Sequence, residues 1–211
     1  MADVLIKACG LRTPDDIDAA VAAGVTHVGL VHYAPSARHV ELDQAAALRA
    51  RLPASVKAVL LLVNHDPAET AAAIARVNPD IVQFHGNETP QWLAILRQVV
   101  PQQLWKAYGV KNARILAEAS DYAGAAHRIL YDAPAGALPG GNGLAIDWSL
   151  FAGHRHALPW GLAGGLSPDN VAEAIRRTGA PLVDASSGLE SAPGVKDPAR
   201  IAAFAEAARS A

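Results

Sequence analysis

Short apolar segments alternate with longer alanine-rich segments along the whole chain. The apolar segments are rich in β-branched residues, which is typical of strands, whereas the alanine-rich segments have a helical period. The pattern predicts eight strands, over Leu5–Cys9, His27–His32, Val56–Val63, Ile81–His85, Leu104–Tyr108, Arg128–Tyr131, Trp160–Ala163 and Leu182–Ala185.

Helix starts are marked by a capping residue followed by proline. The side-chain oxygen of the cap accepts a hydrogen bond from a free backbone N–H, and proline has no N–H to leave unpaired. Gly24, after an alanine-rich segment, predicts a helix end. Five such pairs each follow a predicted strand within a few residues: Thr13-Pro14, Asp66-Pro67, Thr89-Pro90, Ser167-Pro168 and Asp197-Pro198.

The repeated alternation of strand and helix predicts parallel strands joined by right-handed crossovers. The chain has 211 residues, close to the lower limit of about 200 for a TIM barrel. We therefore expect an α/β fold in which residues 1–211 form a single-domain TIM (β/α)8 barrel. A doubly wound open sheet is the alternative, because periodicity does not show whether a sheet closes.

Composition narrows the class of protein. The chain is 51% hydrophobic and 18% charged, with a formal net charge of −2, which is typical of a compact cytoplasmic domain. The near-neutral balance argues against nucleic acid or a membrane surface as partner and favours a small molecule. No apolar run approaches the roughly 18 residues of a membrane span, and no secretion signal is visible. The single cysteine, Cys9, forms no internal disulfide.

Chemically useful side chains stand at the predicted strand ends. Catalytic groups of TIM barrels lie at the C-terminal ends of strands, where the strand-to-helix loops gather. Alternation along the first strand points Lys7 and Cys9 the same way, so both can face the barrel interior. A lone cysteine is more commonly a buried structural thiol. For His85, a contact with a backbone carbonyl near the barrel mouth is an equal alternative to a role in the site, and His85 is not placed in the catalytic pair. The strand-end candidates are Cys9, Arg38, His85, Asp132 and Asp184.

Three glycine-bearing turns lie in the second half of the chain, over residues 139–148, 162–170 and 184–194. Glycine lets backbone N–H groups approach a ligand, and the positive end of a following helix favours an anion. The last two turns follow the seventh and eighth predicted strands, where barrels usually bind phosphate. The sequence therefore predicts a phosphate site there.

The motifs together resemble a known family. The stretches "KACGL", "VQFHGNE", "PGGNGLAIDWSL", "GLAGGLSPDNVAEAI" and "VDASSGLESAPGVKDPARI" are similar to the signatures of phosphoribosylanthranilate isomerase, a TIM-barrel enzyme of tryptophan biosynthesis. The resemblance runs from about residue 5 to residue 209. It implies an Amadori rearrangement that converts N-(5-phosphoribosyl)anthranilate, an aminoaldose, to an aminoketose without metal or cofactor.

The resemblance also assigns roles. Cys9 matches the family's base, which removes the proton from carbon 2, and Asp132 matches the acid that protonates the ring oxygen. Arg38 matches the arginine that contacts the anthranilate carboxylate, and Asp184 a residue that contacts or supports substrate. Lys7 is the cation we expect to help Cys9 reach its thiolate. Phosphate binding is expected at Gly141, Gly143, Gly164, Gly165, Ser187 and Gly188.

Some positions differ from the family pattern: Ala37 replaces a proline before Arg38, and His32 replaces an aromatic or aliphatic residue. Two other functions stay open. A dual-substrate sugar-phosphate isomerase would also serve histidine biosynthesis, but that chemistry generally uses two aspartates, one of them where this chain has Cys9. A non-catalytic phosphate-ligand binding barrel would need neither Cys9 nor Asp132. The sequence leaves monomer and homodimer open.

Overall fold

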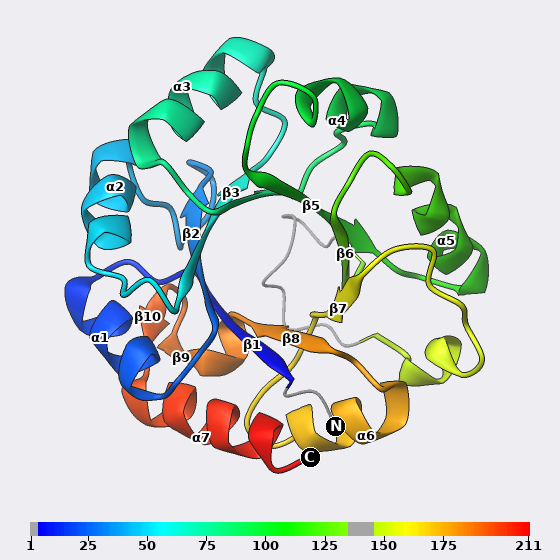
Figure 1. The fold of residues 1–211 in the computed structure, drawn as a ribbon. Helices are drawn as coiled ribbons and strands as arrows, with labels where there is room; N and C mark the ends of the chain where they lie inside the picture. The colour runs from blue at the N-terminus through cyan, green and yellow to red at the C-terminus, as the bar shows by residue number, and fades with distance from the viewer. Residues whose placement is uncertain (1–3, 135–145) are drawn as a thin grey trace.

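Eight parallel strands close into a barrel, in chain order, in the computed structural model, which describes residues 4–134 and 146–211 (Figure 1). Since β1 pairs in parallel with both β2 and β8, the sheet is continuous all the way round. The predicted TIM barrel is confirmed, and the open doubly wound sheet is excluded. The strands are β1 (Leu5–Cys9), β2 (His27–His32), β3 (Lys57–Leu62), β4 (Ile81–Phe84), β5 (Gln103–Gly109), β6 (Arg128–Asp132), β7 (Trp160–Leu162) and β8 (Leu182–Ala185).

Helices surround the barrel on its outer side (Figure 1). The α-helices are α1 (Pro14–Ala22), α2 (Leu42–Ala50), α3 (Pro67–Val77), α4 (Pro90–Leu96), α5 (Ala113–Glu118), α6 (Val171–Thr178) and α7 (Pro198–Arg209). Three short 3-10 helices are η1 (Ala119–Tyr122), η2 (Trp148–Phe151) and η3 (Ser187–Leu189). Within the described residues, no helix has the length and apolar character needed to cross a bilayer.

Four of the five predicted cap-and-proline pairs begin helices, with Thr13, Asp66, Thr89 and Asp197 as the capping residues. The prediction at Ser167-Pro168 is wrong, because α6 begins at Val171 after Asn170. The Ser167 N–H donates a hydrogen bond to Asn170 Oδ1 at 2.9 Å. A side-chain acceptor three residues ahead thus holds this stretch in a turn and delays the helix.

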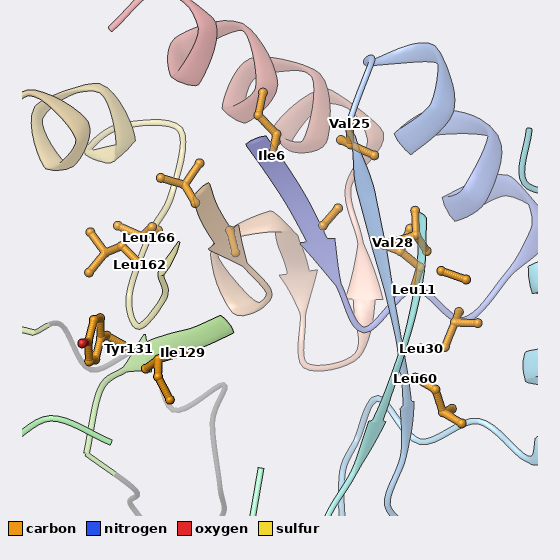
Figure 2. Close-up of a cluster of buried hydrophobic side chains, with 14 of the residues drawn as sticks. Ile6, Leu11, Val25, Val28, Leu30, Leu60, Ile129, Tyr131, Leu162 and Leu166 are labelled. Atoms are coloured by element: carbon orange, nitrogen blue, oxygen red, sulfur yellow. The ribbon is translucent and has the colours of Figure 1, made fainter. Parts of the chain in front are cut away.

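The larger core lies between the outer face of the strands and the helices. Ile6 on β1 and Val28 and Leu30 on β2 are at most 1% exposed, and Figure 2 shows their side chains among other apolar groups of this layer. Burying one such side chain stabilises the fold by roughly 1.5–3 kcal/mol. This layer fixes how each strand is rotated, and so which residues face the barrel interior.

The barrel interior carries the opposite residues of the same strands. Its lower part is mainly apolar, with His27 beside Trp105, and its apolar residues are Leu5, Val59, Ile81, Trp105, Leu130, Ala163 and Leu182. Its upper part contains Cys9, Val31, Leu61 and Val63, with Tyr33 packed against them. Lys7, which is fully buried, lies one alternation below Cys9 on β1. Because strand alternation points Lys7 and Cys9 the same way, both reactive side chains lie in the barrel interior above its lower apolar residues. We call these lower apolar residues the apolar plug.

A small hairpin follows β8 and was not predicted from the sequence. Its antiparallel strands are β9 (Glu190–Ala192) and β10 (Val195–Lys196). Gly194 in the turn has φ +78°, a conformation that glycine adopts without strain. The hairpin brings Glu190 and Lys196 back over the mouth of the barrel, next to Arg38.

Candidate active site

A pocket that is partly open to solvent lies at the C-terminal ends of the strands. It is lined by the predicted residues Cys9, Arg38, Asp132, Asp184, Gly164, Gly165 and Ser187. Lys7 lies beneath it, and Gly188 packs against the backbone of Leu166. Gly141 and Gly143 lie outside the described residues. Residues from five different segments of the chain thus meet at the C-terminal ends of the strands, as predicted.

Cys9 is the last residue of β1, and its position depends on the neighbouring strand. Cys9 pairs with Gly29 of β2. A Cβ atom at Gly29 would lie 2.6 Å from the Cys9 Sγ and 3.0 Å from its Cα, closer than real contacts allow. Gly29 therefore leaves the space that the thiol occupies, and Cys9 is only 5% exposed.

Below the thiol, Lys7 and Asp184 form a buried ion pair. Lys7 Nζ donates to Asp184 Oδ2 at 2.9 Å, joining β1 to β8. Burial opposes the charged form of Lys7, but Asp184 and Cys9 together raise the Lys7 pKa. Burial raises the pKa of Asp184, against the lowering effect of Lys7. We interpret the pair as charged, since a 2.9 Å contact between buried groups gives each ion its counter-charge.

Burial and this ion pair together shift the pKa of the Cys9 thiol. Burial raises the pKa of the Cys9 thiol, Lys7 lowers it, and Asp184 raises it further. Lys7 therefore acts in the expected direction, but burial outweighs it and the net shift is upward. A thiol with a raised pKa is less often ionised at neutral pH, yet its thiolate is a stronger base.

Asp132 ends β6, and two groups hold its carboxylate. Oδ1 accepts a hydrogen bond from the Ala133 N–H at 2.7 Å, and Oδ2 lies 3.1 Å from His85 Nε2. His85 thus contacts the candidate acid, and within the described residues its ring contacts no backbone carbonyl.

Arg38 reaches the pocket from the loop after β2, anchored by a residue that was not predicted. Its Nε and Nη2 donate to the two oxygens of Glu190 at 2.7 and 2.8 Å. A bidentate contact of this kind fixes the plane of the guanidinium. Because Glu190 occupies the Nε side, the edge formed by Nη1 and Nη2 stays available for a second carboxylate.

Lys196 extends this network to the backbone under Cys9. Its Nζ donates to Glu190 Oε1 at 2.7 Å and to the Ser186 carbonyl at 2.9 Å. The Ser186 hydroxyl donates to the Cys9 carbonyl at 3.0 Å. Burial raises the pKa of Glu190, but the Arg38 and Lys196 cations lower it by more. The net shift of the Glu190 pKa is therefore downward. The only sequence signal for Glu190 and Lys196 was their place in the stretch "SSGLESAPGVKD".

Glycines in the turns after β7 and β8 let neighbouring backbone segments lie very close to these turns. Gly164 has φ +77°, and a Cβ there would lie 2.4 Å from the Ala133 N and 3.0 Å from Asp132 Oδ1. A Cβ at Gly188 would lie 2.1 Å from the Leu166 carbonyl oxygen. A side chain at Gly188 would push the turns after β7 and β8 apart, and one at Gly164 would push the turn after β7 away from the end of β6.

One group of side chains has the composition of a metal site. Among residues 4–134 and 146–211, the ligand atoms of His32, His39 and Glu41 lie within 4.8 Å of one another. However, His39 Nδ1 accepts a hydrogen bond from the Tyr33 N–H at 3.1 Å, so Nε2 carries the proton of the neutral ring. That nitrogen lies 3.2 Å from Glu41 Oε1. A cation would have to displace this proton, so the group fits a role in holding the loop before Arg38.

Comparison with known proteins agrees with the geometry. Residues 6–207 match the family described as N-(5'phosphoribosyl)anthranilate (PRA) isomerase. A protein of Erythrobacter litoralis, named N-(5'-phosphoribosyl)anthranilate isomerase, is 62% identical over 207 residues, covering 98% of this chain and 99% of the relative. A protein of Cereibacter sphaeroides with the same name is 49% identical, covering 99% of this chain and 100% of the relative.

Solved structures lead to the same family. Phosphoribosyl anthranilate isomerase of Thermotoga maritima superposes with a TM-score of 0.90 at 32% identity, covering 99% of this chain and 100% of that chain. Another phosphoribosyl anthranilate isomerase structure, in complex with reduced 1-(o-carboxyphenylamino)-1-deoxyribulose 5-phosphate, gives a TM-score of 0.87 at 31% identity with the same coverage. From its barrel, its pocket and these relatives, we conclude that this chain belongs to the N-(5'-phosphoribosyl)anthranilate isomerase family.

Proposed function

We propose that the pocket converts N-(5'-phosphoribosyl)anthranilate to 1-(2-carboxyphenylamino)-1-deoxyribulose 5-phosphate in tryptophan biosynthesis, with Cys9 as base and Asp132 as acid. The observation that carries this proposal is that both residues line one pocket, from strands three positions apart round the barrel. An acid and a base on separate walls can reach two different atoms of one sugar.

In the proposed reaction, Asp132 first gives a proton to the ring oxygen, and the bond from this oxygen to carbon 1 breaks as a Schiff base forms. The Cys9 thiolate then removes the proton from carbon 2. The electron pair of that C–H bond moves toward the nitrogen and gives an enolamine, which becomes the aminoketose. His85, whose Nε2 lies 3.1 Å from Asp132 Oδ2, holds the carboxyl group in position.

The remaining residues hold the two anionic ends of the substrate. Arg38 offers its Nη1 and Nη2 edge to the anthranilate carboxylate, while Asp184 keeps Lys7 in place below Cys9. The phosphate is assigned to Gly164, Gly165, Ser187 and Gly188, together with Gly141 and Gly143. All acid, base and anion contacts in this scheme come from the chain, so it uses no metal or cofactor. We assign the reaction to the cytoplasm.

Neither alternative function is favoured. A dual-substrate isomerase would be expected to have an aspartate where this chain has Cys9. The names of the relatives give the tryptophan-pathway activity. A mere binding barrel leaves the convergence of Cys9 and Asp132 on one pocket without a reason. As to assembly, phosphoribosylanthranilate isomerase of T. maritima is described as dimeric. A homodimer is therefore as compatible with our proposal as a monomer.

The proposal is tested by following the conversion of N-(5'-phosphoribosyl)anthranilate by proton NMR. We expect Cys9→Ser and Asp132→Asn each to lower kcat/KM by at least about 100-fold, the usual contribution of general acid-base groups. Asp66→Asn is the matched control: Asp66 caps α3 on the surface, and asparagine caps equally well. Full activity in either site variant, or none in the unmodified protein, contradicts the proposal.

A further inference from the structure

The floor of the pocket carries an amide that no protein group satisfies. Gln83 lies on β4 in register with Leu61 of β3 and Trp105 of β5, and it is 1% exposed. It lines the same pocket as Cys9 and Asp132. Within residues 4–134 and 146–211, neither its Nε2 nor its Oε1 has a hydrogen-bond partner.

An unpaired buried amide is costly, so its position calls for an explanation. Leaving a buried donor or acceptor unpaired destabilises a fold, whereas an apolar side chain of similar shape does not. The neighbouring interior residues Leu61 and Trp105 are largely apolar. Asp184 Oδ1, in the same pocket, also has no partner within the described part of the chain, although its Oδ2 holds Lys7.

Strand alternation places the amide one step below His85, the residue that contacts the candidate acid. Ile81, Gln83 and His85 succeed one another on the inner face of β4. Ile81 belongs to the apolar plug, and His85 contacts Asp132 at the mouth. Gln83 therefore lies between the plug and the acid, at the level where a sugar held between Arg38 and the turns after β7 and β8 would rest.

The chemistry of the amide selects one kind of partner. Nε2 only donates hydrogen bonds and Oε1 only accepts them. A phosphate or a carboxylate only accepts, so either would leave Oε1 unpaired and facing a negative charge. A pair of neighbouring hydroxyls can accept from Nε2 and donate to Oε1 at the same time. In the proposed substrate, the 2- and 3-hydroxyls of the ribose are such a pair of neighbouring hydroxyls.

We propose that the Gln83 amide recognises the 2- and 3-hydroxyls of the substrate's ribose, and so positions carbon 2 for Cys9. This inference rests on the proposed function, since it takes the ribose from that substrate. Gln83 becomes a specificity residue of the pocket: it selects a sugar that carries both hydroxyls over one that lacks the 3-hydroxyl. The 2-hydroxyl becomes the ketone of the product, so only the 3-hydroxyl can be removed without preventing the reaction.

The test compares two proteins on two substrates. The unmodified protein and Gln83→Leu are each assayed with N-(5'-phosphoribosyl)anthranilate and with its 3-deoxyribose analogue. We expect the unmodified protein to lose about 10- to 100-fold in kcat/KM on the analogue. We expect Gln83→Leu to lose a similar factor on the natural substrate but less than about 3-fold further on the analogue, because the lost contact is the same one.

Several controls keep the outcome clear. Ile81→Val, one step lower on the same face of β4, leaves the discrimination between the two substrates at its original value. If Gln83→Leu does not fold, Gln83→Met, which is unbranched and of similar length, replaces it. Equal losses on the analogue in both proteins would overturn the role of Gln83 while the isomerase activity stands. Absence of turnover of the natural substrate by the unmodified protein overturns the proposed function itself.

Discussion

At the scale of single residues, small side chains decide where the reactive ones can lie. Gly29 faces Cys9 across β1 and β2, and Gly161 faces Leu182 and Leu130 in the apolar plug. At each position an added Cβ would lie 2.6 Å from a neighbouring side-chain atom. The two sites are equally crowded, but only Gly29 adjoins a group to which we assign chemistry.

Gly29→Ala is expected to move the Cys9 thiol and to lower kcat by about 100-fold. A methyl group at this position overlaps Sγ, and a displacement near 1 Å of a reacting group is enough for such a loss. The measurement is steady-state kinetics on N-(5'-phosphoribosyl)anthranilate together with urea unfolding. Gly161→Ala is the control, expected to lower stability through overpacking while kcat stays close to its original value. Equal kcat in both variants contradicts this role of Gly29.

The roles of individual residues could be predicted only where a local signal existed. Cys9 and Asp132 stand at strand ends, so alternation and position were enough to bring them to the pocket. Glu190 and Lys196 act through contacts with Arg38 and Ser186, and Glu190 lies 152 residues away from Arg38 in the sequence. Sequence periodicity does not encode such contacts. Gln83 was missed because an apolar strand with one glutamine carries no signal of an unpaired amide.

At the scale of elements, the Lys7 and Asp184 pair holds the two strands where the barrel closes. Both side chains are at least 92% buried, and their contact joins β1 to β8. A buried ion pair contributes little compared with apolar residues of the same size, but a single partner left alone is strongly unfavourable. Loss of one member of the pair is therefore expected to destabilise the fold by more than the intact pair stabilises it.

Lys7→Met is expected to lower the free energy of unfolding by about 3–5 kcal/mol, because it leaves a buried carboxylate without its counter-charge. The double variant Lys7→Met, Asp184→Leu is expected to recover most of that loss. Urea unfolding of the single and double variants measures the coupling. The exposed pair of Arg51 and Asp18 provides the control, since Arg51→Met has little effect on a solvated contact. Strictly additive losses at Lys7 and Asp184 would show that the two residues are not coupled.

Element boundaries were predictable where capping is local. Thr13, Asp66, Thr89 and Asp197 begin helices as predicted, and the strand boundaries agree closely. The start of α6 was missed because the Ser167 N–H donates to the side chain of Asn170, which holds residues 167–170 in a turn before the helix. The hairpin of β9 and β10 was missed because its strands have three and two residues, too few to show a period.

At the scale of the whole molecule, buried histidines couple stability to pH. His27, in the lower interior, is 7% exposed, and its ring lies tilted against Trp105 with the ring centroids 5.2 Å apart. Burial, aided by the charges of Lys7 and Arg128, lowers the His27 pKa to about 4. Half-buried His156, stacked on Trp160, has its pKa lowered to about 4, mainly by burial. Both rings are neutral in the folded protein and take up a proton more readily when it unfolds.

The contribution of these two histidines to stability is therefore expected to be constant above about pH 6.5, the ordinary pKa of the unfolded group, and to fall between pH 6.5 and 4. The slope from His27 is about 1.4 kcal/mol per pH unit, and His156, being more exposed, adds less. Urea unfolding at pH 7 and pH 5 measures it. His27→Gln removes the titrating group and is expected to flatten the dependence. An unchanged slope in this variant would assign the effect to other groups.

The seam between β1 and β8 also has a consequence for synthesis of the protein. The chain is made from its N-terminus at about 5–20 residues per second. Since 177 residues separate Lys7 from Asp184, roughly 9 to 35 s pass between their appearance at the ribosome. During that interval Lys7 has no counter-charge, and the edge of β1 that will pair with β8 is open. A truncated mRNA that ends before the codon for residue 184 yields a polypeptide without Asp184. Such a polypeptide can neither close its sheet nor build its pocket, and it is left for proteolysis.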